Sequence, residues 1–209
     1  MQITVFGASG KVGRIIVQKA LEKNINVVAF VRRGTILNSS KNLKVIVGDI
    51  YNISDVDNAI KGSDAVVSAL GSWGTPKKDI LTEGMKNIIP SMQKHGLKRI
   101  ISLTGADATV NNESSSVISK LSQTVLKLFA KKILQDGQNH IQHLMDSKLD
   151  WTVVRSPVMN EKGSELDYTL TKIKPMPWTT INRNSVALSM IELLKDHNFA
   201  KQAPYIKRV

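Results

Sequence analysis

The chain has 209 residues, enough for one domain with its own core, and its 29 lysines and arginines against 17 acidic residues give a net charge of +12. It contains no cysteine, which excludes disulfides, thiolate metal sites and a cysteine nucleophile. The basic residues are spread along the chain without interleaved aromatic residues, so we expect no nucleic-acid binding. No apolar run approaches the ~20 residues that span a bilayer, and a strand pattern rather than a signal peptide follows Met1. We therefore expect a cytoplasmic protein with no membrane partner.

Short apolar segments alternate with segments of helical periodicity over the first three quarters of the chain. Strands are predicted over 3–6, 27–31, 45–47, 65–69, 99–103 and 151–154, and helices over 12–22, 54–60, 80–94 and 138–147. Each predicted strand is apolar on both faces, as in a parallel sheet covered by helices. The alternation predicts a single-domain α/β fold of the Rossmann type over residues 1–209, with a doubly wound, mostly parallel sheet and helices on both faces.

The remaining segments have weaker patterns. A polar loop is predicted over 109–116, followed over 117–132 by an amphipathic helix with a stripe of apolar residues. We expect this helix to pack on the domain or on a partner subunit, and a membrane surface is the less favoured alternative. Beyond residue 157 we predict a strand over 168–172, a helix over 184–195 and a last strand over 203–206.

A glycine-rich turn carries the strongest functional signal. The sequence Gly7-Ala8-Ser9-Gly10-Lys11-Val12-Gly13 stands between the first predicted strand and the first predicted helix. Here Gly7 permits a tight turn, Gly10 lets the backbone approach a pyrophosphate, and Gly13 lets the helix pack closely on the strand. The start of the helix offers free N–H groups to phosphates, and Ser9 adds a hydroxyl donor. The turn therefore predicts a dinucleotide site.

Two arginines select the form of the dinucleotide. Arg32 and Arg33 follow the second predicted strand, where an NAD site places an acidic residue against the ribose 2′-hydroxyl and an NADP site places arginine against the 2′-phosphate. No acidic residue occurs between Glu22 and Asp49. Because the guanidinium is a permanently charged planar donor suited to phosphate, NADP(H) is preferred over NAD(H).

The ends of the other predicted strands are expected to form the remaining walls of the dinucleotide site, since ligands of open α/β sheets bind at the carboxyl ends of the strands. Asp49 is expected to accept a hydrogen bond from the adenine amino group, and Ile50 to cover the ring. The other candidates at successive strand ends are Ala69, Leu70, Gly71, Ser102, Thr104, Ser156 and Pro157.

Together these motifs resemble the NAD(P)H-binding, atypical short-chain dehydrogenase group that includes biliverdin-IXβ/flavin reductase and NmrA-like proteins. Beyond the glycine turn the resemblance is carried by Val47-Gly48-Asp49, Leu70-Gly71, Glu83-Gly84 with Asn87-Ile88, His95-Gly96 and the run from Trp151 to Pro157. It implies NADPH binding and hydride transfer to flavins, quinones or biliverdin-like acceptors. It also implies that Thr104, with Ser102 beside it, lies near the nicotinamide. Val158 stands where the flavin reductase has a histidine, which argues against biliverdin reduction.

Two further motifs are interpreted as non-catalytic. Tyr168 and Lys172 have the Y-x-x-x-K spacing of short-chain dehydrogenases but fall after the sixth strand, in a segment that alternates like a strand. On a strand they would lie ~13 Å apart, too far for the lysine to tune the tyrosine. His140 and His143 are expected at the surface, and no carboxylate follows them at ligand spacing, so no metal site is predicted.

These expectations combine into one leading hypothesis. The chain is predicted to be an NADPH-dependent reductase of a small planar acceptor, flavin or quinone, bound between loops 71–80, 104–120 and 156–182. The alternative is a non-catalytic NADP(H)-binding redox sensor, because no acid–base group is evident beside the cofactor site. A sugar-nucleotide epimerase or dehydratase is less favoured because the Tyr-Lys pair is displaced. The expected state is a monomer or homodimer.

Overall fold

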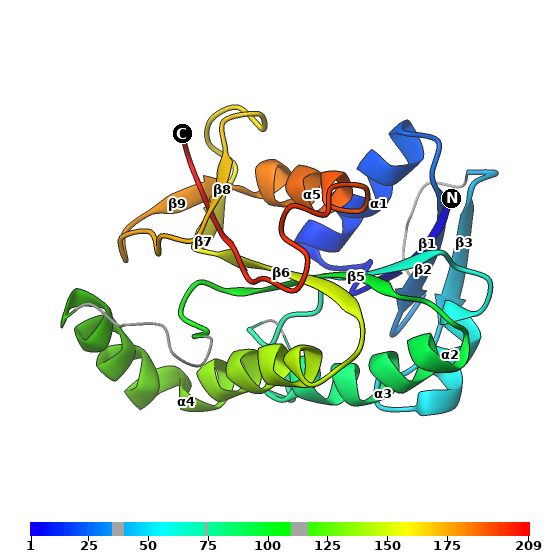
Figure 1. Cartoon of the computed structure of the whole chain (residues 1–209), viewed down its shortest axis with the longest axis horizontal. Coiled ribbons are helices and arrows are strands. Elements are labelled where there is room, and N and C mark those ends of the chain that lie inside the picture. The colour runs from blue at the N-terminus through cyan, green and yellow to red at the C-terminus, as the bar shows by residue number, and fades with distance from the viewer. Residues whose placement is uncertain (35–39, 74, 110–116) are drawn as a thin grey trace.

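An eight-stranded sheet forms the centre of the computed structural model, in the order β3-β2-β1-β4-β5-β6-β10-β8 (Figure 1). The strands are β1 (Gln2–Phe6), β2 (Asn26–Val31), β3 (Leu43–Val47), β4 (Ala65–Ser68), β5 (Arg99–Gly105), β6 (Asp150–Ser156), β8 (Thr169–Thr171) and β10 (Tyr205–Lys207). All neighbours are parallel except β8, which runs antiparallel to β10. The strand order reverses between β1 and β4, the position where doubly wound sheets bind ligands.

The structure describes residues 1–34, 40–73, 75–109 and 117–209, and side chains are not described for 117–130. Most of the predicted loop 109–116 and most of the apolar stripe predicted over 117–132 therefore lie outside the described residues. No helix within the described part of the chain is both long enough and apolar enough to cross a membrane.

Helices cover both faces of the sheet, as predicted (Figure 1). α1 (Lys11–Glu22) and α5 (Arg183–Glu192) pack together on one face, and α2 (Ile53–Ile60), α3 (Ile80–Lys94) and α4 (Val117–Met145) lie on the other. Two separate buried clusters of apolar side chains fill the two interfaces. Because both faces of the sheet are covered, the residues of β1, β4 and β5 are buried at nearly every position, and the predicted Rossmann-type fold is confirmed.

Two predictions about individual elements were wrong. β3 was expected to be apolar and covered on both faces, but it is the edge of the sheet, and its Val45 and Val47 side chains are exposed. The two helices predicted over 117–132 and 138–147 are one helix, α4, because nothing between them breaks the helical backbone.

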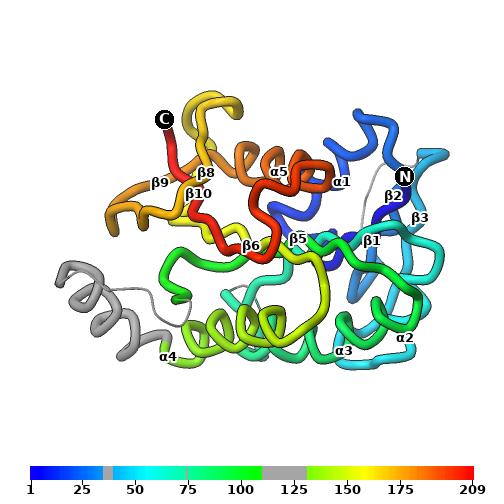
Figure 2. Tube along the Cα trace, viewed as in Figure 1, coloured from blue at the N-terminus to red at the C-terminus, as the bar shows by residue number. Residues whose placement is uncertain are grey.

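The chain after β6 adds elements that were only partly predicted. β7 (Val158–Asn160) and β9 (Thr180–Asn182) pair in parallel as a separate two-stranded sheet that the sequence pattern did not indicate. The strand predicted over 168–172 is the shorter β8, and β10 enters the main sheet between β6 and β8 (Figure 2). The amide side chain of Asn182 caps α5 by accepting from the Asn184 N–H at 2.8 Å.

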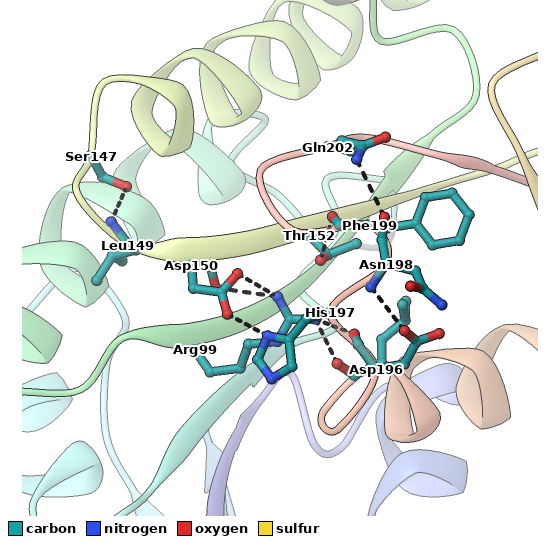
Figure 3. Close-up of polar contacts among 11 residues, drawn as sticks. Arg99, Ser147, Leu149, Asp150, Thr152, Asp196, His197, Asn198, Phe199 and Gln202 are labelled. Carbon is teal, nitrogen blue, oxygen red and sulfur yellow. Dashed lines mark hydrogen bonds and ion pairs between the residues drawn. The ribbon is translucent and has the colours of Figure 1, made fainter.

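A polar network fastens the C-terminal segment to the amino ends of β5 and β6 (Figure 3). The buried Arg99 guanidinium donates to the Asp150 carboxylate at 2.9 Å and to the carbonyls of Leu193 and Asp196 at 2.5 and 3.0 Å. His197 Nδ1 lies 2.8 Å from the other Asp150 oxygen. This network lies at the amino ends of the strands, whereas the predicted cofactor residues follow their carboxyl ends.

Candidate active site

The glycine turn after β1 has the close backbone packing that its sequence predicts. Gly7 has a φ of +74°, a conformation that glycine adopts without strain, and its carbonyl accepts from the Gly10 N–H at 2.9 Å. A Cβ at Gly7 would lie 2.6 Å from the Ala69 carbonyl oxygen, so the turn touches the loop that follows β4. A Cβ at Gly13 would lie 2.1 Å from the Gly7 oxygen, so only glycine lets α1 begin this close to β1.

The first turn of α1 has the features of an anion site. Gly10 is the N-cap, no side chain caps the helix, and no acidic residue occupies its first turn. The first N–H groups of α1 are therefore free to donate to a phosphate, and the helix dipole adds partial positive charge. Ser9, Gly10 and Lys11 are exposed at this point, whereas the Val12 side chain is buried and can offer only its backbone. These residues fit a bound pyrophosphate.

The two arginines follow β2 at the same edge of the sheet. β1 and β2 are neighbours and pair Phe6 with Phe30, so the glycine turn and the segment after Val31 leave the sheet side by side. Arg32 and Arg33 are exposed, and neither forms an ion pair with another described residue. Their guanidinium groups are thus available to an anion beside the turn.

The loops after β3 and β4 place the next predicted residues. The Asp49 carboxylate accepts from the Tyr51 N–H at 3.1 Å and the side chain stays exposed. Ile50 is buried, and its carbonyl accepts from the Asn87 amide at 2.7 Å, which ties this loop to α3. Gly71 has open space where a side chain would be, next to the loop that contacts Gly7.

The two candidate catalytic hydroxyls at the end of β5 both lie against α4. Ser102 is fully buried, and its Oγ lies 2.7 Å from His140 Nε2. The Thr104 hydroxyl lies against Gly137, where a Cβ would come within 2.8 Å of its Oγ1. The surface position expected for His140 was wrong, because α4 turns that side chain into the core, where burial and the neighbouring His143 lower its pKa to about 3. A neutral His140 therefore orients Ser102.

Ser156 and Pro157 end β6 beside the end of β5, where Ser156 pairs with Gly105. Ser156 is buried, and its hydroxyl donates to the Pro157 carbonyl at 3.0 Å. The preceding Arg155 is also buried, donates from Nε to the Ala203 carbonyl at 2.7 Å, and stacks on the Tyr205 ring. Arg155 thus has a structural role at the end of β6, and only the last residues of this segment reach the site.

Sequence reasoning missed Asp136, a buried carboxylate on α4. It accepts from the backbone N–H groups of Leu81 and Thr82 at 3.1 and 2.8 Å and from the Ser72 hydroxyl. It therefore caps α3 from another helix and anchors the start of loop 71–80. Helical spacing gave no clear signal for it, because Leu134, Ile141 and Leu144 place residues 137 and 140 on the inner face of α4 and residue 136 only at its margin.

The Tyr168 and Lys172 motif is not assembled as a catalytic pair. The Tyr168 hydroxyl donates to the Glu192 carboxylate of α5, and burial together with that carboxylate raises the tyrosine pKa above its usual range. Tyr168 directly precedes β8 and Lys172 follows it, at the outer edge of the sheet. The expected non-catalytic role agrees with this geometry.

The reversed strand order, the glycine turn and the uncapped start of α1 define a dinucleotide-binding protein of the Rossmann class. Comparison with protein families agrees: residues 7–197 match the model of the NAD(P)H-binding family, and the chain belongs to that family. A relative from Saccharomyces cerevisiae, UPF0659 protein YMR090W, is 28% identical over 211 residues, covering 95% of this chain and 88% of the relative.

Solved structures show the same fold at low sequence identity. The anaerobilin reductase ChuY from Escherichia coli O157:H7 superposes with a TM-score of 0.79 at 18% identity, covering 100% of this chain and 97% of ChuY. A short-chain dehydrogenase/reductase from Veillonella parvula, solved with NADP, superposes with a TM-score of 0.79 at 16% identity and covers 99% and 94% of the two chains.

Proposed function

We propose that this protein is an NADPH-dependent reductase that transfers hydride to a small planar acceptor, a flavin or a quinone. One observation carries the cofactor part of the proposal. α1 begins at the glycine turn with neither a side-chain cap nor an acidic residue in its first turn, and the three glycines pack closely there. Arg32 and Arg33 support NADPH over NADH, since only NADPH presents a 2′-phosphate to them.

The acceptor half rests on the exposed apolar residues around the same edge of the sheet. Large apolar side chains are exposed in the segments that follow β4 and β6: Trp73, Val158, Ile173, Met176 and Trp178. Lys174 reaches from one of these segments to Asp107, after β5, at 2.9 Å. Exposed apolar side chains beside a nucleotide site suit a flat, apolar acceptor.

The chain's own residues would mainly bind and orient the reactants. When bound, NADPH supplies the hydride. The α1 N–H groups would hold its pyrophosphate, the arginines its 2′-phosphate, and Gly71 would leave room for the nicotinamide end. Flavins and quinones can take the accompanying proton from water, so the engagement of Ser102 and Thr104 with α4 does not prevent their reduction.

The test is NADPH oxidation, followed by its absorbance, with FMN, riboflavin and simple quinones as acceptors. We expect turnover with at least one of them and slower turnover with NADH. Absence of turnover with every acceptor, from protein that binds NADPH, would contradict the reductase proposal.

A redox sensor is the second candidate, and the positions of Ser102 and Thr104 favour it. Both hydroxyls are buried against α4, and the titratable side chains nearest the end of β5 are already engaged, His140 with Ser102 and Asp107 with Lys174. A sensor should bind NADP⁺ and NADPH with clearly different affinities and oxidise NADPH with none of the acceptors. Titration of both forms separates the two proposals.

A further inference from the structure

A second hollow lies apart from the glycine turn, between the segment that leads into β8 and the C-terminal half of α5. Its volume is about 470 Å³, within the range of small-molecule sites. Its lining includes Leu166, Tyr168, Leu188, Glu192, Asp196 and Phe199. None of them belongs to the glycine turn or to the loops after β1 to β5, so this groove is separate from the proposed cofactor site.

The walls of the groove are about half apolar and half polar. The apolar part includes Leu188 and Leu193 on the α5 side, both of which are buried, and Phe199. Leu166 stands on the opposite wall with 73% of its surface exposed. An apolar ligand body lying between these walls would remove the Leu166 side chain from water, which favours binding.

Two carboxylates give the groove a charge opposite to that of the chain. Glu192 is the last residue of α5 and Asp196 follows in the turn after it, and no lysine, arginine or histidine among the described residues forms a direct ion pair with either carboxylate. Arg99 lies close by: its guanidinium donates to the Asp196 carbonyl and the Asp150 carboxylate (Figure 3), and its charge also attracts the Asp196 carboxylate. Both carboxylates line the same groove, so a cation bound there would be attracted to both of them.

Hydrogen bonds hold the two carboxylates in position. The Tyr168 hydroxyl donates to Glu192, and the Asn198 N–H donates to Asp196 Oδ1 at 2.8 Å. Tyr168 also lines the groove, so its bond to Glu192 joins the segment before β8 to α5. Both carboxylates are therefore held in place in a groove that Leu188 and Leu193 also line.

We propose that this groove binds a cationic amphiphile, a primary amine attached to an apolar body. The ammonium group would lie by Glu192 and Asp196, and the apolar body would lie between Leu166 and the α5 side. Neutral or anionic molecules with the same body would lack the charge pairing. This inference does not depend on the reductase proposal.

Calorimetric titration with octylamine, octanol and octanoate tests the groove. We expect octylamine to bind at least tenfold more tightly than the other two, and equally well with and without saturating NADPH. Glu192→Gln, whose amide oxygen can still accept from Tyr168, should weaken octylamine binding at least fivefold. Glu161→Gln is the matched control, since that exposed carboxylate pairs with Arg183 outside the groove and should leave binding unchanged.

A second variant keeps the test decisive if Glu192→Gln folds poorly. Leu166→Lys, at an exposed position, would place an ammonium group at the groove and should abolish octylamine binding. The proposal is overturned if octylamine binds no more tightly than octanol, if the folded variants bind it like the wild type, or if NADPH displaces it.

Discussion

Removing the carboxylate of Asp136 should destabilise the protein more than any other single polar change on α4. In Asp136→Ala, the N–H groups of Leu81 and Thr82 lose their cap, and the buried Ser72 hydroxyl loses its charged acceptor. A lost N-cap costs roughly 0.5–2 kcal/mol, and a buried donor left unsatisfied costs roughly 1–3 kcal/mol. The middles of these ranges sum to about 3 kcal/mol in the free energy of unfolding.

Urea unfolding followed by circular dichroism measures this loss directly. For a domain of this size, about 3 kcal/mol corresponds to a fall in Tm of roughly 6–12 °C. Asp136→Asn keeps one oxygen acceptor and should fall between wild type and Asp136→Ala. Asp146→Ala is the control, because that exposed carboxylate directly after the same helix accepts only from Gln142 among the described contacts. A loss below about 1 kcal/mol for Asp136→Ala would refute the interhelical cap.

Three further predictions concern the cofactor turn, its arginines and the buried histidine. Arg32→Ala and Arg33→Ala should each weaken NADPH binding about tenfold or more, because a hydrogen bond from a charged group is lost, and should change NADH binding little. Equal losses of affinity for both nucleotides would contradict the assignment. Gly13→Ala should reduce NADPH binding and lower Tm although alanine favours helices, because its Cβ meets the Gly7 carbonyl at 2.1 Å, and unchanged values would count against this packing. Burial lowers the pKa of His140 to about 3, so the native state binds fewer protons than the unfolded chain, whose histidine titrates near ~6.5. Stability should therefore fall as pH drops below ~6.5, by up to about 1.4 kcal/mol per pH unit, and His140→Gln should flatten that slope in urea unfolding at pH 7, 6 and 5; identical slopes would refute it.

Sequence patterns predicted the parts of the fold that depend on local signals. β1, β2, β4, β5 and β6 are short apolar runs, and burial on both faces makes such runs easy to recognise. The glycine turn was predictable for the same reason, since its function needs three glycines at one place in the chain. β3 was misjudged because an edge strand and a central strand share the same residue types.

Contacts between distant segments were not predictable in the same way. β7 and β9 pair across about twenty residues, and three-residue strands carry too little pattern to detect. Asp136 and His140 were missed because polar side chains on a helix suggest solvent, whereas here each meets a partner far along the chain. The groove beside α5 likewise depends on tertiary packing that places residue 166 opposite residue 188.

The most direct test of the account is calorimetric titration of the purified wild-type protein with NADPH and NADH. The helix start behind Gly7, Gly10 and Gly13 predicts saturable binding of NADPH at one site per chain, and Arg32 and Arg33 predict weaker binding of NADH. The proposed site would be contradicted if folded protein gave no heat of binding with either nucleotide and a competition assay also detected no binding of either.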